Sequence, residues 1–111
     1  MPEDPRPAEL LKGTLDLLIL RTLELRPLHG AAIAERIAQT TRGTFQVKAG
    51  SLFPALHRLE QEGWLDGAWD TSTDGRRVKV YTLTRSGRRQ LATEKANWQR
   101  VSAAMAQVLG G

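Results

Sequence analysis

The chain has 111 residues, no cysteine and a net charge of +4, with 41% hydrophobic and 25% charged residues. This length allows one domain with a small core, and the composition is that of a globular chain and not of a disordered tail. The absence of cysteine excludes disulfides, thiolate metal sites and thiol catalysis, and the basic balance favours a polyanionic partner.

The N-terminal part predicts a flexible leader followed by one very apolar helix. Residues 1–9 contain three prolines and three acids, and they do not resemble a signal peptide. The longest unbroken apolar run, from Leu17 to Leu20, is too short for a membrane span. The first helix is predicted from Leu10 to Leu25, before Pro27, with nine leucine and isoleucine side chains pointing to nearly every side. Such a helix is either wholly buried in its own domain or lies between that domain and a second subunit.

A turn at residues 27–30 and a second helix at residues 31–39 are expected next. The second helix presents Ile33 and Ile37 on one face, while its alanines keep it slim enough for close packing.

The third helix is predicted to begin near Ala49 and to end before Gly63, a typical residue after a helix C-terminus. Ser51 is the expected N-cap, with Pro54 in the first turn. The apolar stripe consists of leucines, and the opposite face carries no acid in its first two turns. That acid-free face is where a polyanion could approach.

A β-hairpin and a long helix complete the chain. Strands are expected at residues 64–70 and 78–84, joined by a turn that contains Asp74-Gly75. Thr84 is positioned to cap a last helix from Arg85 to Leu109.

This order of elements predicts a mainly α protein with a small β-hairpin. Residues 10–84 match a winged helix-turn-helix domain, in which the third helix enters a DNA major groove and the hairpin contacts the flanking backbone. Residues 1–9 are the flexible leader in this interpretation, and residues 85–111 form a C-terminal dimerisation helix. The residues expected to contact DNA lie at the start of the third helix, on its exposed side and on the hairpin: Lys48, Ser51, Phe53, Pro54, His57, Arg58, Arg76, Arg77 and Lys79.

Several of these residues have a second, structural interpretation. Arg58 either reads guanine or holds a phosphate, or it pairs with Glu62 one helical turn later. Ser51 either caps the helix or binds phosphate beside the helix N-terminus, and the two roles are compatible. Phe53 either packs half-buried or contacts thymine methyl groups and sugars.

The last helix carries apolar residues at heptad spacing, with Glu94 interrupting one position. A domain this small cannot bury such a stripe, so we expect a homodimer in which this helix pairs with its symmetry mate or with the partner's first helix. The alternative is a helix that folds back onto its own domain. The residues expected at the dimer interface are Leu11, Leu15, Leu18, Leu91, Trp98, Val101, Met105 and Val108.

The same residues resemble the PadR family of transcriptional regulators. The resemblance rests on residues 11–20, His29-Gly30, residues 50–60, Gly63-Trp64, Gly75-Arg76-Arg77, residues 81–84 and Trp98. It covers residues 10–109 and is nearest to the short type with a single C-terminal helix, often encoded beside permease genes. It implies a dimeric winged-helix DNA-binding protein, usually a repressor, relieved in some members by a small molecule.

The chain departs from the family pattern at two positions. Phe53 stands where the family often has tyrosine, which removes a phenolic hydroxyl contact, and Ala31 stands where it often has an aromatic residue. The resemblance also assigns Trp98 either to dimer packing or to an effector pocket at the dimer interface, with Glu94 as the contact for a cationic compound.

The leading prediction is a cytoplasmic, homodimeric repressor that binds a pseudo-palindromic double-stranded operator. It needs no cofactor and no metal, and a small-molecule effector at the dimer interface is its one expected ligand besides DNA. A winged-helix module that binds protein instead of DNA is the alternative, although such modules tend to lose the basic wing. An enzyme is not expected, because His29 and His57 form no acid–base pair, metal site or nucleophile–base arrangement.

Overall fold

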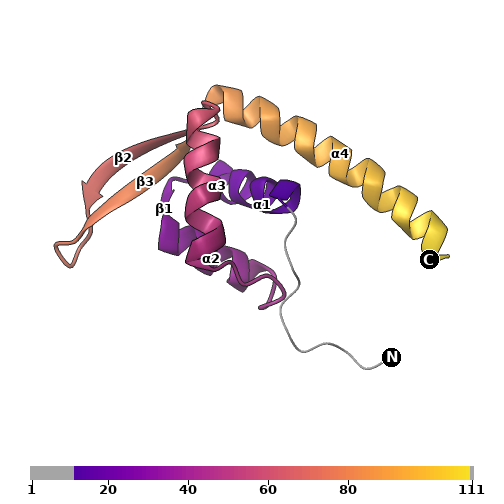
Figure 1. The fold of residues 1–111 in the computed structure, drawn as a ribbon, viewed down its shortest axis with the longest axis horizontal. Coiled ribbons are helices and arrows are strands. Elements are labelled where there is room, and N and C mark those ends of the chain that lie inside the picture. Colours follow the sequence, from indigo (N-terminus) through magenta and orange to yellow (C-terminus); the bar gives the residue numbers. More distant parts are fainter. Residues whose placement is uncertain (1–11, 111) are drawn as a thin grey trace.

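The computed structural model describes residues 12–110 and contains four helices and a three-stranded antiparallel sheet (Figure 1). The elements in chain order are α1 (Lys12–Leu25), β1 (Leu28–His29), α2 (Gly30–Thr40), α3 (Ala49–Gln61), β2 (Leu65–Thr71), β3 (Arg77–Leu83) and α4 (Arg85–Leu109). This is the winged-helix arrangement expected from the sequence. The strands project to one side of the helical core, and α4 extends away on the other side.

Helix α1 lies in the centre of the core. Its side chains at Leu15, Ile19, Leu20 and Leu23 are buried against α2, α3 and the sheet, whereas Leu25 at its end is exposed. Leu17 and Leu18 are only partly buried. The helix therefore packs mainly into its own core and leaves a partly exposed strip, and contact of that strip with a second subunit stays a prediction.

The segment before α2 is a short strand and not only a turn. Leu28 pairs with Tyr81 and His29 with Val80, which makes β1 the outer neighbour of β3 in the order β1-β3-β2. The turn prediction was incomplete because β3 offers the edge that β2 leaves open, and two extended residues after Pro27 satisfy its backbone groups. His29 also caps α2, since its Nδ1 accepts a hydrogen bond from the backbone N–H of Ala32 at 3.4 Å.

Both ends of helix α3 are defined by backbone hydrogen bonds and not by side-chain caps. Lys48 is its N-cap residue, in extended conformation, and makes no side-chain cap hydrogen bond. The N-cap prediction for Ser51 was wrong, because the chain turns helical at Ala49 and the N–H of Ser51 already donates to the carbonyl of Lys48 at 3.0 Å. Pro54 correspondingly lies inside the helix, beyond its first turn.

The predicted end of α3 is confirmed. Gly63 has φ +80° and donates to the carbonyl of Glu60 at 3.0 Å, and Trp64 donates to that of Leu59 at 3.1 Å. This pair of hydrogen bonds is a Schellman motif, which requires a left-handed residue at the position of Gly63.

The hairpin pairs β2 with β3 in the register Leu65–Leu83 to Thr71–Arg77. Each strand lies within one residue of its predicted bounds. The connecting turn is closed by the N–H of Ser72, which donates to the carbonyl of Arg76 at 2.7 Å, with Gly75 at φ +85°. We call residues 65–83 the wing.

Helix α4 has the predicted bounds and the predicted cap, since Thr84 Oγ1 accepts from the N–H of Gly87 at 2.9 Å. Thr84 Oγ1 also donates to the carbonyl of Gly63 at 2.7 Å, which joins the start of α4 to the turn after α3. At Gly87 a Cβ atom would overlap the carbonyl oxygen of Trp64, so only glycine allows this approach. Beyond Leu91, whose side chain is buried, the helix leaves the core.

Candidate nucleic-acid interface

The outer face of α3 is exposed and free of acid in its first turn. Ser51, Pro54 and His57 are exposed on it, and Lys48 is exposed just before the helix. The buried stripe of Leu52, Ala55, Leu56 and Leu59 holds the opposite face in the core. The hydrophobic pattern thus places these four exposed residues where a ligand as large as a DNA duplex could reach them.

Phe53 takes an intermediate position. The residue is 49% exposed, yet its Cε1 lies so close to α2 that a Cβ at Gly30 would be 2.8 Å from it. Part of the ring is therefore packing against the start of α2, and the remainder is open to contact from outside. The packing fits the half-buried interpretation of this aromatic side chain, and its contact with thymine methyl groups and sugars stays a prediction.

Arg58 points into the protein and not outward. Its Nη2 donates to Oδ1 of Asp16 on α1, with side chains that are 31% and 11% exposed, respectively. The partner expected from helical spacing, Glu62, is thus replaced by one that lies 42 residues away in the sequence. This ion pair joins α3 to the central helix α1.

The wing turns one face toward α3, and we call it the inner face. Residues directly paired across antiparallel strands point to the same side, so Gly67 and Tyr81 share this face with Trp69 and Lys79. Tyr81 is buried, and burial raises the pKa of its phenol.

A salt bridge holds the inner face to α3. Lys79 Nζ donates to Oε1 of Glu60 at 2.8 Å, and this hydrogen bond raises the pKa of the lysine. Gly67 makes room for the pair, because a Cβ there would overlap Cε of Lys79 and lie 3.0 Å from Oε2 of Glu60. The wing and the outer face of α3 therefore adjoin each other in a defined geometry.

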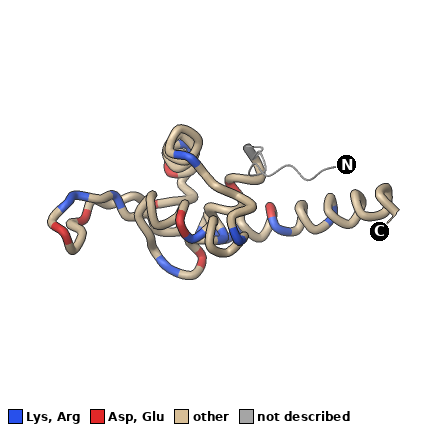
Figure 2. The backbone as a smooth tube through the Cα atoms, turned by 90° about the horizontal axis from the view of Figure 1, so that it is seen from below, with Lys and Arg blue, Asp and Glu red and all other residues tan. Residues whose placement is uncertain are grey.

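The two arginines near the wing tip have different surroundings. Arg76 Nε lies 3.6 Å from Oδ2 of Asp74, whose pKa is lowered mainly by a hydrogen bond from Ser72. The guanidinium of Arg77 lies over the indole ring of Trp69, 5.0 Å from its centroid. In Figure 2 the basic segments at this end of the molecule lie along one strand of the wing, and acidic segments lie at its tip and on the other strand.

The residues expected at the dimer interface fall into three groups. Leu15 and Leu91 are buried within their own subunit's core, and Leu18 is partly buried. Leu11 lies outside the described residues. The exposed members all lie on the distal part of α4: Trp98, Val101, Met105 and Val108.

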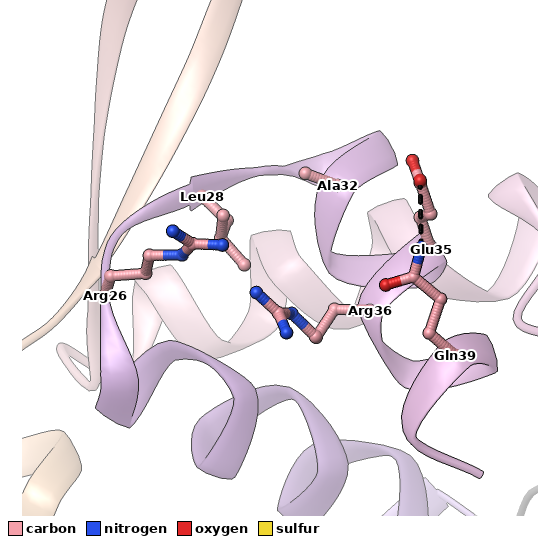
Figure 3. Close-up of a pocket in the computed structure, with 6 residues that line it drawn as sticks. All are labelled: Arg26, Leu28, Ala32, Glu35, Arg36 and Gln39. Atoms are coloured by element: carbon pink, nitrogen blue, oxygen red, sulfur yellow. Dashed lines mark hydrogen bonds between the residues drawn. The ribbon is translucent and has the colours of Figure 1, made fainter.

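The structure places the expected effector residues on α4 as well. Glu94 accepts a hydrogen bond from Gln90 at 3.0 Å, and Trp98 is 50% exposed one turn later. A shallow pocket of about 150 Å³ lies elsewhere, between the end of α1, β1 and α2. In it the guanidinium groups of Arg26 and Arg36 approach each other, while Glu35 accepts a hydrogen bond from Gln39 (Figure 3). The effector site at Glu94 and Trp98 stays a prediction.

Within residues 12–110, none of the helices is long and apolar enough to span a bilayer. The same range contains no group of three or more histidines and acids placed to hold a metal ion.

Comparison with known proteins agrees with this geometry. Residues 19–93 match the family described as "Transcriptional regulator PadR-like family". The chain is 31% identical to the transcriptional regulator Rv3488 of Mycobacterium tuberculosis over 103 residues, which cover 93% of this chain and 90% of the relative.

Two solved structures are similar in both sequence and fold. A PadR-like transcriptional regulator from Bacillus cereus is 30% identical with a TM-score of 0.77, over 94% of this chain and 99% of that one. A PadR family transcription regulator from Clostridium difficile is 31% identical with a TM-score of 0.73, over 86% of this chain and 97% of that one.

Proposed function

Because the chain belongs to the PadR-like family of transcriptional regulators, which are not enzymes, we propose that it binds double-stranded DNA sequence-specifically and represses transcription. The observation that carries this proposal is the adjacency of two surfaces. The acid-free outer face of α3 lies beside a wing that carries Arg76 and Arg77, and the Glu60–Lys79 salt bridge joins the two elements.

Each surface suits a different part of a duplex. The outer face of α3 has the width for a major groove, with Ser51, Pro54 and His57 directed at base edges. Lys48 before the helix and the wing arginines are suited to the phosphates on either side, which fix orientation without reading sequence. Arg58 positions α3 through Asp16 in this scheme and contributes to DNA contact indirectly.

The operator-binding form is proposed to be a homodimer that pairs through α4. Four large apolar side chains stand exposed at heptad-related positions from Trp98 to Val108, and no charged residue follows Arg100 (Figure 2). Two copies that cover this stripe would bind two half-sites related by a two-fold axis. A cationic effector at Glu94 and Trp98 would act at the same interface, and we expect the protein in the compartment that holds the DNA, the cytoplasm.

Selection from genomic DNA fragments with the purified protein, followed by titration of the winner at two salt concentrations, tests the proposal. We expect one enriched near-palindrome, bound by a dimer and weakened by salt, because phosphate contacts release counterions. His57→Ala serves as the matched variant, since it should change the selected sequence and leave the fold intact. The same motif selected by both proteins would remove His57 from base recognition.

Binding to protein instead of DNA is the second candidate. It is favoured by the acidic residues at the wing tip, where Asp70 and Asp74 are exposed beside the arginines. Weak binding without sequence preference in the selection experiment would favour this candidate.

A further inference from the structure

The three basic residues of the wing are not equivalent. Lys79 is held by Glu60 at 2.8 Å, and Arg76 lies 3.6 Å from Asp74. Among residues 12–110, Arg77 has no acidic partner within salt-bridge distance. Its guanidinium instead lies over Trp69. Arg77 is thus the wing cation whose charge no carboxylate offsets.

Trp69 lies outside the hydrophobic core, beneath the guanidinium of Arg77. Its side chain is 62% exposed on β2, in register with Lys79, on the inner face of the wing that turns toward α3. An exposed tryptophan on an edge strand contributes little to the hydrophobic core. A flat ring under a guanidinium, in contrast, restricts the rotamers of the arginine.

Stacking of this kind leaves the arginine able to bind an anion. A guanidinium can lay one face on an aromatic ring while the N–H groups at its edge stay free to form two parallel hydrogen bonds to a phosphate. Lysine cannot do both, because its ammonium is a compact point charge. The order imposed before binding lowers the entropy that the side chain loses on contact.

We propose that Trp69 and Arg77 form the phosphate-binding element of the wing, with Trp69 as the positioning residue that presents the guanidinium of Arg77 to the DNA backbone. This rests on the proposed function. In this proposal each wing makes one ordered phosphate contact, through Arg77, and not three equivalent basic contacts. Lys79 instead fixes the wing against α3, and the charge of Arg76 is partly neutralised by Asp74.

The test is a double-mutant cycle measured by anisotropy of a labelled mixed-sequence duplex of about 30 base pairs, roughly three helical turns. The variants are Arg77→Ala, Trp69→Ala and the double variant, with Trp69→Phe as the rescue and Arg76→Ala as the matched neighbour. Circular dichroism melting of each variant checks the fold. Affinity is measured over a salt series so that the number of phosphate contacts is obtained separately from their strength.

A plot of log K against log salt has a negative slope, and Arg77→Ala should make this slope shallower by about 0.9 for each wing, because one phosphate contact is lost. Trp69→Ala should weaken binding about two- to fivefold for each wing with little change of slope, as expected for an exposed cation–π pair. Trp69→Phe should restore most of that loss. In the Arg77→Ala background, Trp69→Ala should cost nothing further, and Arg76→Ala alone should cost less than Arg77→Ala.

The proposal is overturned if Trp69→Ala leaves the affinity unchanged, or if it weakens the Arg77→Ala protein as much as the original. The second result would mean that Trp69 acts independently of Arg77. If the unaltered protein fails to bind the duplex even at low salt, the proposed function itself falls, and this proposal with it. The two failures are distinguishable, because failure of the proposed function shows in the unaltered protein, whereas failure of the Trp69–Arg77 proposal shows only in the variants.

Discussion

Arg58 on α3 donates a hydrogen bond to the carboxylate of Asp16 on α1, across 42 residues of sequence, and Asp16 is only 8% exposed. A charge this deeply placed needs its partner, because an unpaired buried carboxylate loses its hydration without compensation. The pair therefore fixes α3 on the core and turns the guanidinium of Arg58 away from the outer face.

Replacing Arg58 should consequently affect stability before it affects DNA binding. We expect Arg58→Ala to lower the free energy of unfolding by about 1–3 kcal/mol, because Asp16 is left unpaired. Urea denaturation measures this loss. The double variant Asp16→Asn with Arg58→Met is the control, since it removes both charges and should recover part of the stability. An Arg58→Ala protein of unchanged stability that binds DNA poorly would instead make Arg58 a direct DNA contact.

Gly67 is required by the salt bridge that lies against it. We expect Gly67→Ala to displace Lys79 from Glu60 and to lower stability by about 1–2 kcal/mol, as overpacking typically does. Thermal melting of Gly67→Ala, measured both in the unaltered protein and in a Lys79→Ala protein, shows whether the clash with Lys79 is the cause. In a Lys79→Ala protein the obstructing Cε is absent, so the same substitution should cost clearly less. An equal cost in both backgrounds would place the requirement for glycine in the strand backbone.

Local patterns in the sequence predict most of the fold, and long-range partners are what they miss. The Thr84 cap, the turn at Gly63 and the bounds of α4 depend on neighbouring residues, and all were predicted. The strand β1 has only two residues, too few for any alternation to show.

In the candidate site, too, the sequence predicts local features and misses long-range partners. The exposed face of α3 follows from its apolar period, but the partners of Arg58 and Lys79 lie on other elements and depend on tertiary packing. Trp69 was overlooked although a signal existed. Counting back from the Asp74-Gly75 turn pairs Trp69 with Lys79, so the predicted register alone places the ring on the same face of the hairpin as Lys79 and Arg77.

Gly87 is the point where α4 passes closest to the turn after α3. We expect Gly87→Ala to lower the free energy of unfolding by about 1–3 kcal/mol, because its Cβ would overlap the rigid carbonyl of Trp64 and force backbone movement. Chemical denaturation gives the value. Gly50→Ala is the matched control on α3, since no atom lies within 4 Å of the added Cβ, and the higher helix propensity of alanine should leave the stability unchanged or raise it by up to about 1 kcal/mol. A Gly87→Ala protein that is as stable as the Gly50→Ala protein would mean that the close approach to Trp64 carries no cost.

The exposed stripe on α4 predicts that oligomerisation depends on single apolar side chains. We expect Met105→Asp to convert the proposed dimer to a monomer, because an unpaired carboxylate at the centre of an apolar interface is strongly unfavourable. Sedimentation velocity over a concentration series measures the state. Ala103→Asp introduces the same charge on an exposed position of the opposite helical face and should leave the dimer intact. Since two linked half-sites bind more tightly than one, the Met105→Asp protein should also lose affinity for a palindromic operator. A Met105→Asp protein that remains dimeric would mean that α4 does not carry the interface.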